Sequence, residues 1–183
     1  MSTPRPPKPA KLVIGVILKE DALLGRIVAA LEERFGPPDM VSPWLPFDYT
    51  DYYRSEMGGP LKRRLFSFRR LIDQAALPAV KLETNRIEGR FCRDRRRRAN
   101  IDPGILTYER FVLATGKNYT HRIYLGRGIF GDLTLVFSGG AFQPLPWTYP
   151  DYAAPDLSGF LTEVRRRYRW ELGGGRPGQK DNR

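Results

Sequence analysis

The segment Lys11-Leu12-Val13-Ile14-Gly15-Val16-Ile17-Leu18 is a short apolar run with β-branched residues at its centre. Runs of this kind are typical of a strand that is buried on both faces of a sheet. Residues 21–35 follow with leucine, isoleucine and alanine at a helical period, and Gly36-Pro37-Pro38 supplies a glycine C-cap with proline beyond it. We therefore predict a central strand over Lys11–Leu18 and a helix over Asp21–Phe35.

The next elements repeat this pattern. The sequence predicts strands over residues 39–46 and 61–71, a helix over 73–90 and a strand over 99–106. The resulting order of strand, helix, strand, strand, helix and strand is that of a ferredoxin-like βαββαβ core. Residues 108–115 fit either a short helix or a strand.

The C-terminal third has a different pattern. Residues 121–125, 132–137 and 141–145 predict a β-meander, and residues 156–172 predict an amphipathic basic helix. The predicted fold class is therefore α+β: an antiparallel or mixed sheet with a ferredoxin-like core, extended by a C-terminal β-meander and a terminal helix.

Length and charge limit the class of protein. The chain has 183 residues, of which 41% are hydrophobic, and this predicts one domain over residues 11–172. We expect a disordered proline-rich lead-in over residues 1–10 and a disordered tail over 173–183. The formal net charge of +11 favours a polyanionic partner: a nucleotide, RNA, DNA or an anionic membrane surface.

Cysteine and histidine are almost absent. The single cysteine, Cys92, excludes an internal disulfide and a multi-cysteine zinc site, and the single histidine, His121, excludes a His-rich metal cage. No apolar run approaches the ~18–20 residues that cross a bilayer, and the N-terminus lacks the apolar region of a signal peptide. We therefore expect a cytoplasmic protein without a transmembrane segment.

Two glycine motifs resemble nucleotide-binding loops but fail on context. The segment Gly126-Arg-Gly-Ile-Phe-Gly131 matches G-x-G-x-x-G, yet a predicted strand follows it where a dinucleotide fingerprint requires a helix. Thr115-Gly116-Lys117 lacks both the upstream glycine and the downstream hydroxyl of a P-loop. We interpret the first motif as a hairpin turn.

One pattern occurs twice. The segments Leu45–Tyr52 and Leu145–Tyr152 both read Leu-Pro-aromatic-x-Tyr-x-Asp-Tyr, and we name them the first and second aromatic-acid packets. They are either two tight turns packed by aromatic rings or two segments that line the opposite sides of one site. We predict that Asp48-Tyr49 and Tyr149-Pro150-Asp151 lie in one cleft that also contains His121.

Three residues are candidates for catalysis. His121 is the only side chain whose ordinary pKa suits acid–base chemistry near neutral pH, although a structural role is an alternative. Asp48 and Asp102 are candidate general bases, and together with Asp51 they are candidate ligands for Mg²⁺. Asp102 lies in Asn100-Ile-Asp-Pro-Gly104, where turn capping is the alternative.

Further residues are candidates for ligand binding. Lys117 and Arg122 flank His121 as a phosphate cradle, and Lys81, Thr84 and Asn85 share one face of a predicted helix. Aromatic rings of the packets could stack on bases or belong to the core. The candidate ligand-binding residues are Tyr49, Asp51, Tyr52, Lys62, Lys81, Asn85, Asn100, Lys117, Arg122, Trp147, Tyr149 and Asp151. The arginine-rich segments 95–98 and 165–169 are interpreted as exposed basic surface.

Taken together, these motifs resemble domain-of-unknown-function family 4416, which comprises small single-domain prokaryotic proteins. The resemblance spans Lys11 to Tyr168, and the arginine run at residues 93–98 departs from it. It implies no established activity, and a GTP-binding label given to some members has no P-loop here to support it. The ordered motifs that carry it are Pro46-Phe-Asp-Tyr-Thr-Asp-Tyr-Tyr53, Leu61-Lys-Arg-Arg64, Lys81-x-x-Thr-Asn85, Asn100-Ile-Asp-Pro-Gly104, His121-Arg-Ile-Tyr-Leu-Gly126 and Pro144-Leu-Pro-Trp-Thr-Tyr-Pro-Asp-Tyr152.

Three hypotheses for function remain open. The first is a protein that binds an anionic ligand, a nucleotide or an RNA phosphate, with phosphate-ester or nucleotide chemistry in a cleft of Asp, Tyr, His, Lys and Arg residues. The second is a non-enzymatic basic module associated with RNA or the ribosome. The third is a structural or partner-binding protein whose tyrosines belong to the core.

Overall fold

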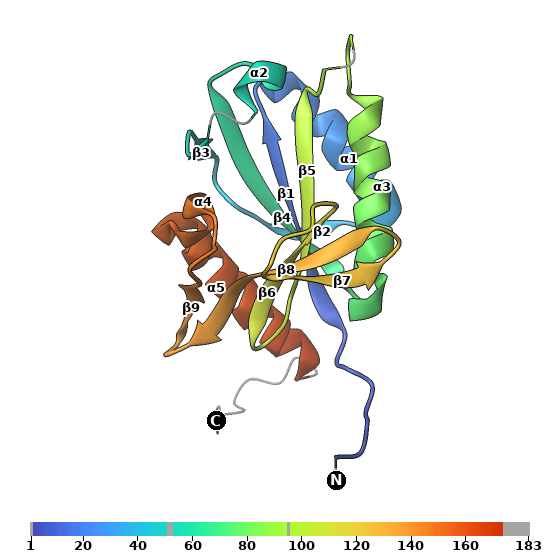
Figure 1. Ribbon diagram of the computed structural model, residues 1–183, viewed down its shortest axis with the longest axis vertical. Coiled ribbons are helices and arrows are strands. Elements are labelled where there is room, and N and C mark those ends of the chain that lie inside the picture. Colours follow the sequence, from blue (N-terminus) through green and yellow to red (C-terminus); the bar gives the residue numbers. More distant parts are fainter. Residues whose placement is uncertain (1, 51–52, 95, 174–183) are drawn as a thin grey trace.

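The computed structural model describes residues 2–50, 53–94 and 96–173, and within them it has an α+β fold (Figure 1). A nine-stranded antiparallel sheet has the strand order β2-β4-β1-β5-β6-β8-β7, with β3 also paired to β4 and β9 also paired to β8. The strands are β1 Ala10–Leu18, β2 Pro38–Val41, β3 Leu45–Phe47, β4 Leu61–Ile72, β5 Ala99–Leu106, β6 Arg110–Thr115, β7 Arg122–Gly126, β8 Ile129–Ser138 and β9 Ala141–Pro144. The helices are α1 Leu24–Phe35, α2 Arg54–Met57, α3 Leu77–Arg90, α4 Pro150–Ala153 and α5 Pro155–Leu172, with 3₁₀ turns at Asp21–Leu23 and Gln74–Ala76.

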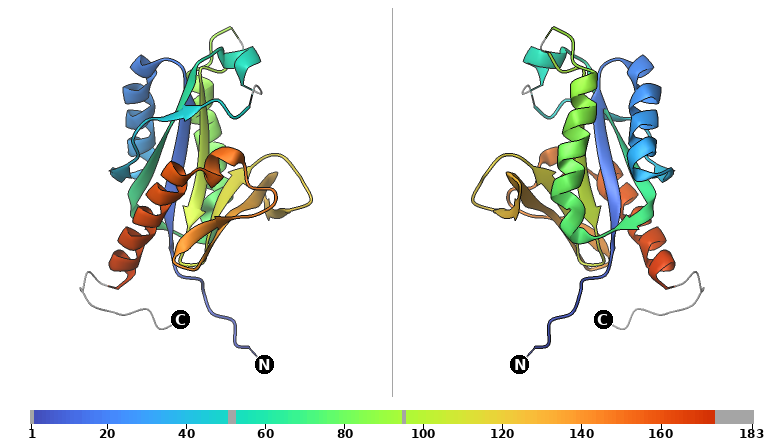
Figure 2. Two further views of the ribbon diagram at one scale, coloured as in Figure 1. Left: turned by 90° about the vertical axis from the view of Figure 1, so that its left-hand side faces the viewer. Right: turned by 90° about the vertical axis from the view of Figure 1, so that its right-hand side faces the viewer.

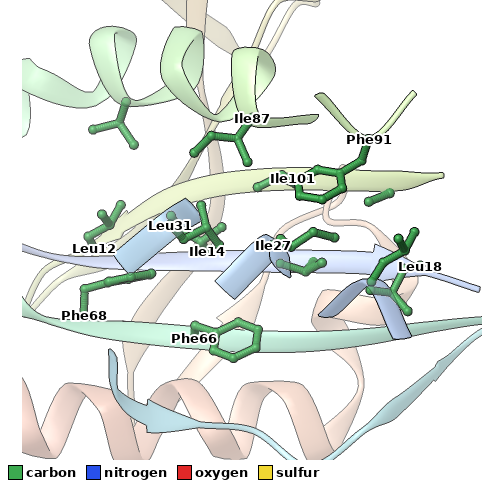
Figure 3. Packing of buried hydrophobic residues seen from close by; sticks show 14 residues of the cluster. Leu12, Ile14, Leu18, Ile27, Leu31, Phe66, Phe68, Ile87, Phe91 and Ile101 are labelled. Carbon is green, nitrogen blue, oxygen red and sulfur yellow. The ribbon is translucent and has the colours of Figure 1, made fainter. Parts of the chain in front are cut away.

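Strand β1 is a buried inner strand of the sheet, as its apolar run predicted. All nine of its residues are buried, and it lies between β4 and β5 with antiparallel pairing on both sides. One face of β1 packs against α1 and α3, which lie near one another in Figure 1. Figure 3 shows this core, in which Ile14 of β1 lies among Ile27 of α1 and Ile87 of α3.

The opposite face of β1 meets α5 over part of its length. Val13 of β1 joins a second apolar cluster with Phe111 of β6 and with Leu161 and Val164 of α5. Helix α5 packs along this half of the sheet because its apolar residues recur at a helical period. The rest of this face, toward the C-terminal end of β1, carries the polar residues described below.

A buried ion-pair cluster joins β1, β2 and α5. The ammonium group of Lys11 is fully buried and lies 2.5 Å from Asp39 and 2.8 Å from Glu171. Ser67 of β4 also donates a hydrogen bond to Asp39. Burial acts to raise the pKa of Asp39, but the hydrogen bonds from Lys11 and Ser67 hold it below its ordinary value.

Most predicted elements are present, with one division. The expected strand over residues 39–46 is two short strands, β2 and β3, and both pair with β4. The break occurs at Ser42, whose hydroxyl accepts a hydrogen bond from the Leu65 amide, and at Pro43, which has no amide proton to donate. The ambiguous segment near residue 110 is a strand, β6.

Strand β8, rather than β7, lies beside β6. Because β6 pairs with most of one edge of β8, strands β7 and β9 share the other edge, at Ile129–Asp132 and Leu135–Ser138. Figure 2 shows the segment that leads into β7 projecting from the body of the sheet.

The chain ends are partly described. Residues 2–9 are exposed and have no regular secondary structure, although the carbonyl of Pro9 accepts a hydrogen bond from Tyr168. The predicted tail lies outside the described residues from position 174 onward. In the part of the chain that is described, no helix combines the length and apolarity needed to cross a membrane.

Candidate functional site

Polar side chains gather on the sheet face opposite α1 and α3. Directly paired residues of an antiparallel ladder project to the same face. Gly15 of β1 is paired with Leu65 and Asp102, and Ile17 is paired with Arg63 and Asn100. These polar residues therefore lie together around one glycine. The same face continues across the sheet, because Val13 is paired with Gly104, Gly104 with Leu113 and Leu113 with Asp132. Asp132 is in turn paired with Arg122.

Arg63 joins the two aromatic-acid packets. Its guanidinium group is buried and lies 4.7 Å from the Phe47 ring centroid and 4.8 Å from that of Tyr152. It also forms an ion pair with the buried carboxylate of Asp151. Phe47 belongs to the first packet, and Asp151 and Tyr152 belong to the second. The repeated segments therefore converge on one arginine of β4.

Tyr152 covers Gly15. A Cβ atom added to Gly15 would lie 3.6 Å from the Tyr152 hydroxyl, so this ring lies close to the backbone of the central strand. The Tyr152 side chain is buried, and neither its hydroxyl nor Nε of Arg63 has a well-aligned hydrogen-bond partner among the described residues. Burial raises the pKa of Tyr152 to about 12, while the charge of Arg63 acts to lower it. The hydroxyl is therefore protonated at neutral pH and is available as a donor.

A β-bulge anchors the second packet. Leu133 and Leu135 of β8 lie opposite consecutive residues of β6, which leaves Thr134 as an extra residue in β8. Because β7 and β9 leave this part of the outer edge unpaired, side chains of the packet reach the carbonyls of β8. The indole nitrogen of Trp147 donates to Leu133 O at 2.8 Å, and Thr148 donates to Thr134 O at 2.5 Å.

Asp132 organises the predicted phosphate cradle. Its buried carboxylate accepts a 2.9 Å hydrogen bond from Nε of Arg122 and lies 3.3 Å from Nε2 of His121. Arg122 also donates to the carbonyl of Lys117 and to the hydroxyl of Tyr149. Several Arg122 donors are thus occupied within the protein, which favours a positioning role for this arginine.

His121 is held by an aromatic ring as well as by Asp132. Its imidazole is stacked on Trp147 with the centroids 5.2 Å apart and the planes at 12°. A carboxylate beside one ring nitrogen fixes the orientation of an imidazole. The contacts with Asp132 and Trp147 therefore hold the His121 ring in one orientation. Trp147 and Tyr149 remain 40% and 49% exposed beside it.

Helix α3 caps the open edge of β5. Strand β6 pairs only with Gly104–Leu106, so the edge at Ile101 has no strand beside it. There Glu88 accepts a hydrogen bond from the Ile101 amide at 2.9 Å, and Lys81 donates to the Ile101 carbonyl at 3.1 Å. These two residues are two helical turns apart and so lie on one face of α3. Burial raises the pKa of Glu88 above its ordinary value.

Lys81 also positions the predicted Asp102. Its ammonium group lies 3.2 Å from Oδ1 of Asp102, and the side-chain amide of Asn100 donates to Oδ2 at 2.5 Å. Arg97 donates to Oδ1 of Asn100 at 3.3 Å and to Glu56 of α2 at 2.8 Å. The predicted residues Lys81, Asn100 and Asp102 therefore form one hydrogen-bonded chain. Arg97 links that chain to α2.

Other predicted residues lie elsewhere. Asn85 is exposed and lies apart from the buried Lys81, so the predicted stripe is divided. Lys62 pairs with Asp21 at 2.7 Å and alternates with Arg63, so it projects from the opposite face of the sheet. Asp48 and Tyr49 are exposed just beyond β3, and Asp51 and Tyr52 lie outside the described residues.

Several arginines of the basic segments 95–98 and 165–169 form ion pairs with glutamates. Arg97 and Arg98 form ion pairs with Glu56 and Glu20, and residue 95 lies outside the described part of the chain. In the terminal helix, ion pairs join Arg166 to Glu163 and Arg167 to Glu171. Arg96, Arg166 and Arg167 are exposed, as expected of basic surface, whereas Arg97 and Arg98 are half-buried beside their acidic partners.

No cluster of metal ligands is found among the described residues. Within residues 2–50, 53–94 and 96–173, no three His, Cys, Asp or Glu side chains are grouped to hold a metal ion. The expected Mg²⁺ site included Asp51, which is outside these ranges.

Arg63, Asp132 and Gly15 were not predicted to belong to the site, and Tyr152 was predicted either to stack on bases or to belong to the core. A signal existed for Arg63, because it alternates in phase with Leu61 and Leu65 and must share their inward face. The importance of Gly15 depends on Tyr152, which is far away in the sequence.

Comparison with known proteins identifies a family. A family model described as Domain of unknown function (DUF4416) matches residues 8–168. The chain belongs to this family. The resemblance carried by its ordered motifs is thereby confirmed. Neither the curated proteins nor the solved structures contain a match. A family of unknown function supplies no activity to transfer, so function is argued from the site.

Proposed function

We propose that this chain binds a small anionic ligand, a nucleotide or another phosphate-bearing molecule, on the sheet face around Arg63 and Tyr152. One observation carries the proposal: two buried donors, Nε of Arg63 and the Tyr152 hydroxyl, lie together without well-aligned acceptors among the described residues. Buried polar groups are normally satisfied, and an oxyanion supplies acceptors for both donors. Gly15 lies beneath the hydroxyl and has no side chain that would occupy the space beside it.

Charge and aromatic rings give further support. A formal net charge of +11 favours the approach of anions. Trp147 and Tyr149, which belong to the same packet as Tyr152, are partly exposed beside His121 and Arg122, and such rings stack on nucleobases. A nucleotide would thus engage the buried donors through its phosphate and these rings through its base.

Isothermal titration calorimetry tests the proposal with inorganic phosphate, adenosine and adenosine monophosphate as probes. Tyr152→Phe removes only the hydroxyl donor, and we expect it to weaken binding of the monophosphate by about tenfold. Tyr168→Phe is the matched control, because Tyr168 is equally buried but its hydroxyl already donates to Pro9. Equal affinity of the wild type, Tyr152→Phe and Tyr168→Phe would contradict the proposal, as would the absence of binding to any probe.

A second candidate function is phosphate-ester or nucleotide chemistry with His121 as the acid–base residue. The contact between His121 and Asp132 supports it, since a buried carboxylate orients the imidazole. Asp102 and Asp48 stay further candidates for catalysis. If phosphatase activity is found with a nucleotide substrate, His121→Gln should lower kcat at least about a hundredfold. Unchanged kcat in His121→Gln would remove His121 from the mechanism.

The RNA- or ribosome-associated module receives less support, because Arg97 and Arg98 are paired with acids. It predicts salt-sensitive RNA binding that is lost when Arg95–Arg98 are neutralised and that is independent of His121.

We also propose that the chain has a ferredoxin-like core in a single domain and that the protein is cytoplasmic. The strand order β2-β4-β1-β5, with α1 and α3 packed against one face of β1, supports a ferredoxin-like core that β7, β8 and β9 extend. One domain over residues 11–172 is consistent with this core. The single cysteine supports a reducing, cytoplasmic compartment.

A further inference from the structure

A concavity of about 500 Å³ lies at the C-terminal end of β1. Three segments line it: the residues just after β1, helix α2 and the loop that precedes β5. Its lining contains five cationic and three acidic side chains, and its volume is in the range of small-ligand pockets. The concavity therefore has a surplus of positive charge.

Two arginines form the fixed walls. Arg97 pairs with Glu56 of α2 at 2.5 Å, and Arg98 pairs with Glu20 just after β1. These pairs hold the three lining segments together, because each joins residues that are about 40 or 80 positions apart. Within each pair the two charges cancel. The surplus positive charge therefore comes from the other cations of the lining, Lys19, Arg93 and Arg96.

Arg93 and Arg96 are held directly opposite one another. The amide of Arg93 donates to the carbonyl of Arg96 at 3.0 Å, and the amide of Arg96 donates to the carbonyl of Arg93 at 2.8 Å. Side chains at such a pair of positions project to the same side, and like charges placed there repel one another. Asp94 lies 3.7 Å from Arg93, but the two side chains are 88% and 78% exposed, so solvent screens this ion pair strongly and also weakens the repulsion between Arg93 and Arg96.

A lysine completes the cationic lining. A Cβ added to Gly58 would lie 3.3 Å from Nζ of Lys19, so this ammonium group is held against the backbone beside α2. Lys19, Arg93 and Arg96 therefore place three positive charges around one hollow. An oxyanion in this hollow would relieve the repulsion between the two opposed arginines, each of which can donate two parallel hydrogen bonds to it.

We propose that this concavity is a second anion site, which binds the phosphate groups of a multiply charged ligand through Arg93, Arg96 and Lys19. It is distinct from the site around Arg63 and Tyr152. The concave shape favours a compact free polyphosphate, whereas an extended nucleic-acid backbone presents the same phosphate chemistry.

Titration of the full chain with inorganic tripolyphosphate and with a single-stranded RNA oligonucleotide tests this site. The double variant Arg93→Gln/Arg96→Gln should weaken binding by about tenfold for each arginine that contacts phosphate. The matched control is Arg69→Gln/Arg70→Gln, which removes the same two charges from exposed positions on β4. Wild-type affinity in this control would exclude a general effect of net charge.

Each outcome is decisive. Selective loss in the Arg93/Arg96 variant supports the site, and whichever probe shows it, tripolyphosphate or RNA, identifies the source of the phosphates. An equal loss in both double variants, or no loss in either, overturns it, as does failure of the wild type to bind either probe.

Discussion

Replacing Tyr152 with phenylalanine should make the protein more stable. The Tyr152 side chain is 2% exposed, and its hydroxyl has no well-aligned partner among the described residues. A buried, unsatisfied polar group costs about 1–3 kcal/mol of desolvation, whereas an apolar group of the same shape does not. Since the packing of the ring against Phe111 and Arg63 is retained, we expect the free energy of unfolding to rise by about 1 kcal/mol.

Tyr168→Phe, at an equally buried tyrosine, should have the opposite effect and make the protein less stable. Tyr168 is 1% exposed, and its hydroxyl donates a 2.7 Å hydrogen bond to Pro9 O. Its loss should lower the free energy of unfolding by about 1 kcal/mol. The two variants delete the same atom from equally buried tyrosines and should differ by about 2 kcal/mol.

Urea denaturation measures this difference directly. With an m-value of about 2 kcal/mol/M, the midpoint should rise by about 0.5 M in Tyr152→Phe and fall by about 0.5 M in Tyr168→Phe. An unchanged m-value would show that the shift reflects stability alone. If Tyr152→Phe is destabilised as much as Tyr168→Phe, the Tyr152 hydroxyl is satisfied in the free protein, and the main support for a ligand on this face is lost.

Three further predictions concern the scaffold. Gly104→Ala should lower stability by about 3 kcal/mol in urea denaturation, because its Cβ would lie 2.8 Å from a backbone carbonyl of β6, whereas Gly15→Ala has room and should change stability by less than about 1 kcal/mol. Lys11→Met should cost about 3–5 kcal/mol by the same assay, since it leaves the carboxylates of Asp39 and Glu171 without their buried cation. The lowered pKa of Asp39 predicts a stabilisation that is complete above its ordinary pKa of 3.8 and declines as the pH falls through the lower folded value; acid titration followed by circular dichroism should show Asp39→Asn without this component.

Much of the fold followed from local patterns. The strand over Lys11–Leu18 and the helix that follows it were readable because a continuous apolar run and a capped helical period are local signals. Strands β4 and β5 begin at their predicted residues, Leu61 and Ala99. The pairing of β8 with β6, and the bulge at Thr134, depend on residues distant in sequence and had no local signal.

The candidate site was partly predictable. Asp132 contacts His121 and accepts a hydrogen bond from Arg122, which donates to Tyr149, so these three candidate residues lie close together. The contact between Lys81 and Asp102 was not predicted. Lys81, Thr84 and Asn85 share one helix at the predicted spacing, but Asn85 is exposed whereas Lys81 and Thr84 are buried, because the sheet covers only part of that helix face.

By itself, the sequence determined the elements, the surplus of positive charge and the presence of two matching aromatic-acid packets. Only the tertiary structure decided that Phe47 of one packet and Tyr152 of the other enclose the same arginine, Arg63, and that Gly15 lies beneath the Tyr152 hydroxyl. The physical reason is register: a strand's alternation sets which residues share a face, but non-local pairing sets which faces meet.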